Sequence, residues 1–132
     1  MKKTLLAFAI FLMSVSSSFA YQIYSQGMSA SGFYNGQSIT AYNYMAVNVN
    51  TNCDWVTFSG WVSTNSYDDT AASFQAWESQ NGLIGEWNYR QGDPNSNFSY
   101  TNNSPNLYWG TINAVMSATH CYAEALLQWA YN

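Results

Sequence analysis

The stretch SASGFYNGQSITAYNYMAVNVN, residues 29–50, decides the fold class. Its Asn35-Gly36 pair is typical of a type I′ turn, because both central positions of that turn need positive φ. We therefore expect a β-hairpin with arms at 29–34 and 37–44. The second arm continues to residue 50 with strict alternation, which predicts one buried and one exposed face. The expected core face is Ile39, Ala41, Met45, Val47 and Val49, and the exposed face is Thr40, Tyr42, Tyr44, Asn48 and Asn50.

Residues 53–62 also alternate, but neither face is polar. Val56, Phe58 and Val62 share one side, and Cys53, Trp55, Thr57, Ser59 and Trp61 share the other. Such a strand is either central and covered on both sides, or half-buried with an apolar face left for a partner.

Later segments extend the β pattern. Residues 63–70 read as a loop, and residues 71–79 are either a short helix or a strand. We favour a strand, because residues 83–91 alternate well afterwards, with Gly85, Trp87 and Tyr89 opposite Glu86, Asn88 and Arg90. Residues 92–106 form a polar connection with a brief strand at 98–101. Residues 107–118 predict a strand whose apolar face is Tyr108, Ile112, Ala114 and Met116.

The C-terminal residues 118–131 fit a helix and a strand equally well. As a strand, they place Cys121, Ala123, Ala125, Leu127, Trp129 and Tyr131 on one face. The sequence thus predicts a mainly β fold, an antiparallel β-sandwich of about 5–7 strands with one disulfide. The alternative is a β-sheet with one packed C-terminal helix.

The first twenty residues have the pattern of a cleaved secretory signal peptide. Lys2 and Lys3 precede an apolar run at 4–15, and Ser18-Phe19-Ala20 is a small-x-small exit. The run is too short for a membrane span, which needs about 20 apolar residues. We expect residues 21–132 to form one β-rich domain, secreted to the medium or the periplasm, with no membrane span.

Charge narrows the range of partners. The whole chain has a net charge of −4. Without its leader, Arg90 would be the only strong base against seven acids. Binding to phosphate backbones or to anionic membranes needs clustered Lys and Arg. Nucleic acid is therefore excluded as a partner.

Cys53 and Cys121 both follow the leader, and two cysteines in an exported protein usually pair. We therefore expect a Cys53–Cys121 disulfide. The alternative is a reactive thiol at Cys121 beside His120. A lone histidine is too little for a zinc site, and no G-x-S-x-G motif accompanies it. We interpret His120 as a hydrogen-bonded residue beside the disulfide, and we expect no metal and no cofactor.

Glu78 and Glu86 lie symmetrically about Gly82. In one hairpin register they would be cross-strand neighbours about 5 Å apart, the separation that retaining glycosidases use. A tight turn at Asn81-Gly82 would leave no pair. Because solvated surface acids are the commoner case, we expect no catalytic residues and no enzyme activity.

Asp93, Asn95 and Asn97 have the spacing that begins a calcium-binding loop. The rest of that pattern is missing, because Phe98 stands where Gly is needed and Ser104 where Glu is needed. We interpret the segment as an Asn-rich turn.

Aromatic residues are the remaining indication of function, since the chain has six Trp and eleven Tyr. Exposed rings beside amides suit sugars, whose C–H faces stack while their hydroxyls exchange hydrogen bonds. We expect a non-catalytic binding or adhesive domain that recognises a glycan or another cell-surface structure. The alternatives are a self-assembling matrix or fibre component and a small secreted toxin or inhibitor. The candidate ligand-binding residues are Tyr42, Tyr44, Trp77, Trp87, Trp109 and Asn113.

Overall fold

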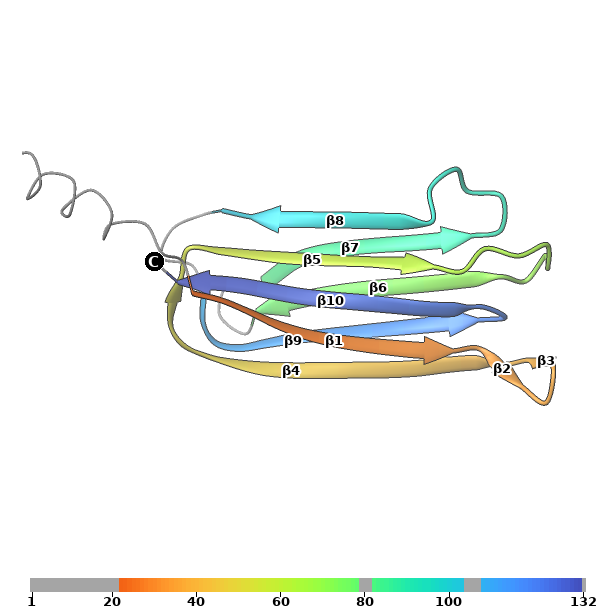
Figure 1. The fold of residues 1–132 in the computed structure, drawn as a ribbon, viewed down its shortest axis with the longest axis horizontal. Helices are drawn as coiled ribbons and strands as arrows, with labels where there is room; N and C mark the ends of the chain where they lie inside the picture. The colour runs from red at the N-terminus through yellow and green to blue at the C-terminus, as the bar shows by residue number, and fades with distance from the viewer. Residues whose placement is uncertain (1–21, 79–81, 104–107, 132) are drawn as a thin grey trace, which may run out of the picture.

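A computed structural model of the chain describes residues 22–78, 82–103 and 108–131, with the backbone alone for 50–52, 102, 108 and 109. Every regular element in these ranges is a β-strand (Figure 1). The strands are β1 (Gln22–Ser31), β2 (Phe33–Tyr34), β3 (Gln37–Ser38), β4 (Thr40–Cys53), β5 (Trp55–Val62), β6 (Ala71–Glu78), β7 (Gly82–Arg90), β8 (Asn97–Asn102), β9 (Tyr108–Thr119) and β10 (Tyr122–Tyr131). No helix within the described ranges combines the length and the hydropathy that crossing a bilayer requires.

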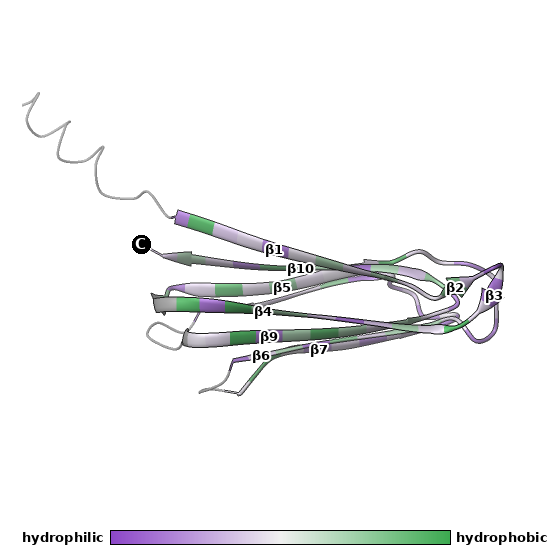
Figure 2. Ribbon diagram, turned by 90° about the horizontal axis from the view of Figure 1, so that it is seen from below, coloured by the Kyte–Doolittle hydropathy of each residue, from purple (hydrophilic) through white to green (hydrophobic). Residues whose placement is uncertain are grey.

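Eight of the strands form two antiparallel four-stranded sheets. The first has the order β1-β10-β5-β8 and the second the order β4-β9-β6-β7. Seen from below, the sheets form two layers (Figure 2). Most connections, such as β4 to β5 and β9 to β10, cross from one layer to the other. This strand order is that of a jelly roll, a sandwich of two Greek keys. The expected antiparallel β architecture is confirmed.

The core lies between the two sheets and follows the period-2 alternation of the sequence. The inner face of β5 contributes Val56, Phe58 and Val62, all essentially inaccessible to solvent. From the opposite sheet, β6 and β9 contribute Phe74 and Ile112 at the same depth. Alternating inward residues of two sheets interdigitate in this way in β-sandwiches, which leaves the intervening residues on the outer faces.

The Asn35-Gly36 hairpin is confirmed, with φ of 48° at Asn35 and 76° at Gly36. It is a small ribbon of β2 and β3 rather than the start of a main sheet. The expected register of the following strand is also confirmed, because Met45, Val47 and Val49 of β4 are buried. Ile39 differs from the expectation. It precedes β4 and is 40% exposed.

The C-terminal segment is the strand β10, so the alternative with a packed helix is wrong. β10 is a central strand between β1 and β5, and its odd-numbered residues Ala123, Ala125, Leu127 and Trp129 are buried. A helix there would leave the backbone of β1 without a strand partner and that of β5 with β8 alone. The expected number of strands was also too low, since the described residues form ten. The count missed β1, of which Gln22–Gly27 has no buried residue and so no alternating core face.

The expected disulfide is wrong, because Cys53 and Cys121 are thiols rather than a bridged pair. Cys53 ends β4, next to the end of β10, where the Asp54 amide donates to the Ala130 carbonyl at 2.9 Å. Cys121 precedes the start of β10. The length of that strand, roughly 30 Å at the ordinary rise per residue, separates them. Disulfides need Cα atoms within about 7 Å.

Candidate functional site

A hollow of the described surface lies on the outer face of the β1-β10-β5-β8 sheet. It has a volume of about 770 Å³. Residues of all four strands line it, and we call it the outer hollow. Its lining is Gly27, Met28, Ser29, Ser59, Gly60, Trp61, Asn97, Glu124, Ala125 and Leu126.

Sheet register explains why these residues meet. Glu124 of β10 lies directly between its cross-strand partners Ser29 of β1 and Trp61 of β5. Trp61 is paired in turn with Asn97 of β8. The next row of the same face holds Gly27, Leu126 and Ser59. The first row thus carries the large or polar side chains of Trp61, Glu124 and Asn97. The second row contains the small residues Gly27 and Ser59, and their small size leaves the hollow open.

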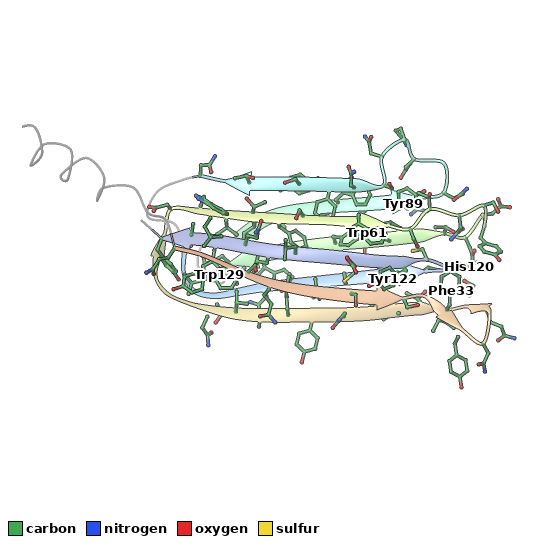
Figure 3. All side chains as sticks on the ribbon, viewed as in Figure 1. Phe33, Trp61, Tyr89, His120, Tyr122 and Trp129 are labelled. Carbon is green, nitrogen blue, oxygen red and sulfur yellow. The ribbon has the colours of Figure 1, made fainter. Side chains whose placement is uncertain are left out.

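A hydrogen-bonded cluster of Trp61, Tyr122 and Glu124 borders the outer hollow. The Trp61 Nε1–H donates to Glu124 Oε2 at 2.9 Å, and the Tyr122 hydroxyl donates to Glu124 Oε1 at 2.6 Å. The two rings meet edge to face, with centroids 5.7 Å apart. Figure 3 shows Trp61 and Tyr122 towards the same end of the sandwich. The cluster fixes both rings while Trp61 stays 42% exposed.

The electrostatics of this cluster are dominated by one carboxylate. The hydrogen bond to Glu124 raises the pKa of the Tyr122 hydroxyl, and a hydrogen bond with Ser29 partly offsets this effect. Both donors hold Glu124 in place, yet a carboxylate has about four lone-pair sites and can accept further hydrogen bonds. The site can therefore offer an aromatic face and a fixed acceptor to one ligand.

Two glycines line the outer hollow for different reasons. A Cβ on Gly60 would meet the Glu124 carbonyl oxygen and the Phe98 ring, each at 2.7 Å. Gly60 therefore permits a close approach of neighbouring strands. A Cβ on Gly27 would meet its nearest atom at 3.7 Å, an ordinary contact. The fold therefore does not require glycine at position 27, and the missing side chain leaves space at the surface.

The sequence-predicted tyrosines lie on the opposite sheet. Tyr42 and Tyr44 of β4 are 79% and 76% exposed on its outer face. Asn113 of β9 is paired with Ala46 of β4 and with Trp77 of β6, so Asn113 and Trp77 share that face with the tyrosines. The structure thus brings four of the six candidates onto one surface, on the other side of the molecule from the outer hollow.

The other two candidates do not join them. Trp87 lies on the inner side of β7, where its ring stacks on Phe98 with centroids 5.1 Å apart and packs against the core. Paired interior aromatics of this kind support the core rather than a ligand. The side chain of Trp109 lies outside the described residues.

Glu78 and Glu86 do not form a pair. A register shift between Ala76 and Trp77 sets Glu78 opposite Gly82, while Glu86 faces Gln75. Glu78 is buried and Glu86 is exposed on the other face of its strand. The β6–β7 hairpin therefore lacks the two facing carboxylates of a glycosidase.

His120 belongs to a polar cluster at one end of the sandwich. Its Nδ1 lies 2.7 Å from Asp69 Oδ1, and the Ser38 hydroxyl donates to Asp69 Oδ2 at 2.6 Å. These two hydrogen bonds, that of Ser38 first, lower the pKa of the Asp69 carboxyl. The Tyr67 ring stacks on the imidazole with centroids 3.6 Å apart. Because the carboxylate stands between the hydroxyl and the imidazole, the order differs from that of a Ser-His-Asp triad, in which the imidazole accepts the serine proton directly.

Asp93, Asn95 and Asn97 do not converge on one point. Asp93 Oδ2 accepts from the Arg90 amide at 2.7 Å, which closes a turn, and Asn97 has entered β8. Among the residues that the structure describes, no group of three or more His, Cys, Asp and Glu side chains could hold a metal ion.

Sequence reasoning missed Trp61, Tyr122 and Glu124 as a site. Tyr122 and Glu124 are two residues apart, so they share a face once this segment is taken as a strand. The cross-strand pairing of Glu124 with Trp61, 63 positions earlier, leaves no local signal in the sequence.

No protein-family model and no curated protein matches this sequence. Solved structures give distant similarities. TmCBM61 in complex with β-1,4-galactotriose has 8% identity and a TM-score of 0.46, over 85% of this chain and 88% of that chain. The VP2 subviral particle of infectious bursal disease virus has 11% identity and a TM-score of 0.46, over 85% and 33%. A family 35 carbohydrate binding module from Clostridium thermocellum has 10% identity and a TM-score of 0.37, over 82% and 90%. Similarities this distant do not bear on function.

Proposed function

We propose that this chain is an exported, non-catalytic glycan-binding domain whose binding site is the outer hollow. The observation that carries the proposal is the fixed cluster of Trp61, Tyr122 and Glu124 beside open space. The leader-like pattern of residues 1–20 supports export, because that pattern is typical of cleaved secretory signals.

The lining of the outer hollow suits a sugar ring. The exposed face of Trp61 provides a surface for C–H stacking, and Leu126 adds an apolar contact. Glu124 accepts hydrogen bonds from sugar hydroxyls, and the Asn97 amide and the hydroxyls of Ser29 and Ser59 both donate and accept. Pockets that recognise small polar ligands generally combine such a surface with a few placed polar groups.

Binding fits the hollow better than hydrolysis does. Among its described lining residues, Glu124 is the only acid, and both of its oxygens already accept hydrogen bonds. Most glycoside hydrolases need two carboxyl groups flanking the scissile bond. We therefore propose recognition without cleavage.

A glycan array with the protein lacking residues 1–20, followed by calorimetry on the glycans that bind, tests the proposal. Trp61→Ala should weaken binding at least tenfold, since buried contacts of a central aromatic residue commonly contribute that much. Gly27→Phe should block the hollow with little effect on folding, because the Cβ at this position has room.

The tyrosines of the opposite sheet provide matched controls and a rival site. Tyr44→Ala removes an exposed aromatic ring without touching the outer hollow. The Tyr44→Ala variant should bind the glycan with the same affinity as the unmodified protein. If Tyr42→Ala or Tyr44→Ala abolishes binding while Trp61→Ala does not, the site is the surface of Tyr42, Tyr44, Trp77 and Asn113, and the outer hollow is the wrong place.

Self-association is a second candidate function, favoured by β4. This strand is an edge of its sheet, spans 14 residues and exposes two tyrosines. Long exposed edges can pair with another copy of the chain. Analytical ultracentrifugation across a wide concentration range separates the two functions, because a glycan-binding monomer keeps one sedimentation coefficient.

A further inference from the structure

We propose that the glycan is an uncharged linear polysaccharide that lies along β5 from Trp61 to Trp55, not a terminal sugar held in the hollow alone. This inference rests on the proposed function and specifies its ligand. It follows from three features of the outer face of the β1-β10-β5-β8 sheet: its two tryptophans, the side chains between them, and its charge.

The first feature is the position of the tryptophans. Trp55, Thr57, Ser59 and Trp61 alternate with the buried residues of β5, so all four lie on the outer face. Trp55 and Trp61 stand at the two ends of this row, six residues apart. At the ordinary rise of about 3.4 Å per residue, they are roughly 20 Å apart. This separation exceeds the size of one sugar ring several times, so one monosaccharide cannot contact both.

The second feature is the polar, low surface between them. Thr57 of β5 and Thr101 of β8 form a cross-strand pair, with their hydroxyl oxygens 3.0 Å apart. Ser59 is paired with Ser99 in the next row, and Gln128 of β10 flanks Thr57 on the other side. Thr57 and Ser59 are half-exposed and have short side chains, and their hydroxyls both donate and accept hydrogen bonds. Such a surface matches the repeated hydroxyls of a sugar chain.

The third feature is charge. Among the described residues of this outer face, Glu124 is the only Asp, Glu, Lys, Arg or His. Arg90 belongs to the other sheet, on β7. With no cation to pair with a carboxylate or sulfate group, an acidic glycan would be repelled by Glu124. The face therefore favours neutral chains.

Chain-length dependence tests the inference. The probes are neutral β-1,4-linked gluco-, manno- and xylo-oligosaccharides from monosaccharide to hexasaccharide, measured by calorimetry at physiological salt. In the series that binds, affinity should rise with length and then level off once the chain spans both tryptophans. Trp55→Ala should lower the affinity of the longest probe roughly tenfold and leave that of the shortest binding probe unchanged. Trp55→Phe keeps an aromatic face and should retain most of the affinity.

The controls separate this inference from the proposed function. Trp61→Ala should weaken the binding of every probe, and Tyr44→Ala should weaken the binding of none. If Trp61→Ala abolishes binding but all lengths bind alike and Trp55→Ala has no effect, the extended site is wrong and the hollow stands. If no neutral probe binds, or acidic oligosaccharides bind better than neutral ones, the inference is overturned. If Trp61→Ala leaves binding unchanged, the proposed function fails as well.

Discussion

Replacing Gly60 with Ala should destabilise the fold far more than the same change at Gly27, although both glycines line one hollow. A Cβ added at Gly60 would lie 2.7 Å from the Glu124 carbonyl oxygen and 2.7 Å from Phe98 Cε1. The carbonyl belongs to a central strand, so no side-chain rotation relieves that contact. The Phe98 ring is held by Phe58, with centroids 5.3 Å apart, and by Phe74, at 4.8 Å.

The expected magnitude follows from these contacts. Overpacking of a core typically costs about 1 to 3 kcal/mol, and a rigid backbone oxygen favours the upper end of that range. Replacing Gly with Ala in a strand otherwise raises the free energy of unfolding by about 0.5 to 1 kcal/mol. Gly60→Ala should therefore lower the free energy of unfolding by about 2 kcal/mol, which corresponds to roughly 10 °C in Tm for a domain of this size. Gly27→Ala, whose Cβ meets its nearest atom at 3.7 Å, should be neutral or slightly stabilising.

Urea unfolding followed by tryptophan fluorescence, together with calorimetric Tm values, measures both variants. A common m value for the two would show that they unfold over the same surface, so that their midpoints are comparable. Equal stabilities for Gly60→Ala and Gly27→Ala would refute the close approach of β5, β10 and Phe98 on which the shape of the outer hollow depends.

Three further results are expected. Burial raises the pKa of the Cys53 thiol to about 11 and also raises the pKa of the Cys121 thiol. Both thiols should therefore react slowly with a thiol reagent until the protein unfolds. A reductant should leave Tm unchanged, because the two cysteines form no disulfide. Because the folded state lowers the pKa of Asp69, its contribution to stability is present above its ordinary value of about 3.8 and is lost as pH falls through the lower folded value. Asp69→Asn should flatten the acid limb of a plot of Tm against pH. Glu124→Gln should lower the pKa of Tyr122 in an NMR titration of the tyrosine ring carbons, because the charged acceptor that raises it is gone.

Local pattern was enough to predict most strands. The Asn35-Gly36 turn needs positive φ wherever it occurs, and the alternation of Met45, Val47 and Val49 fixes which face of β4 is buried. Both signals are properties of a few neighbouring residues. The ambiguity of residues 118–131 has a different origin. Alanine and leucine suit helices by propensity, and only the position between β1 and β5 makes this segment a strand.

The site depends on pairings that the sequence does not encode locally. Trp61 meets Glu124 because β5 and β10, far apart in the chain, are neighbours in one register. A shift of one residue would turn either side chain to the inner face. The disulfide expectation failed for the same reason, since counting cysteines says nothing of the strand length between them.

The position of β5 also determines how the proposed ligand would be held. β5 pairs with β10 from Trp55 to Val62 and with β8 from Val56 to Trp61, so its backbone is held on both sides along nearly the whole row. Its inner residues, Val56 and Phe58, are fully buried in the core, which prevents the strand from rotating. A ligand on the outer face would therefore meet side chains that are already in place, and binding would cost little conformational entropy. For the same reason, amide exchange in β5 should be slow without ligand and change little when a glycan binds. Large protection of β5 on binding would show instead that the ligand orders the sheet.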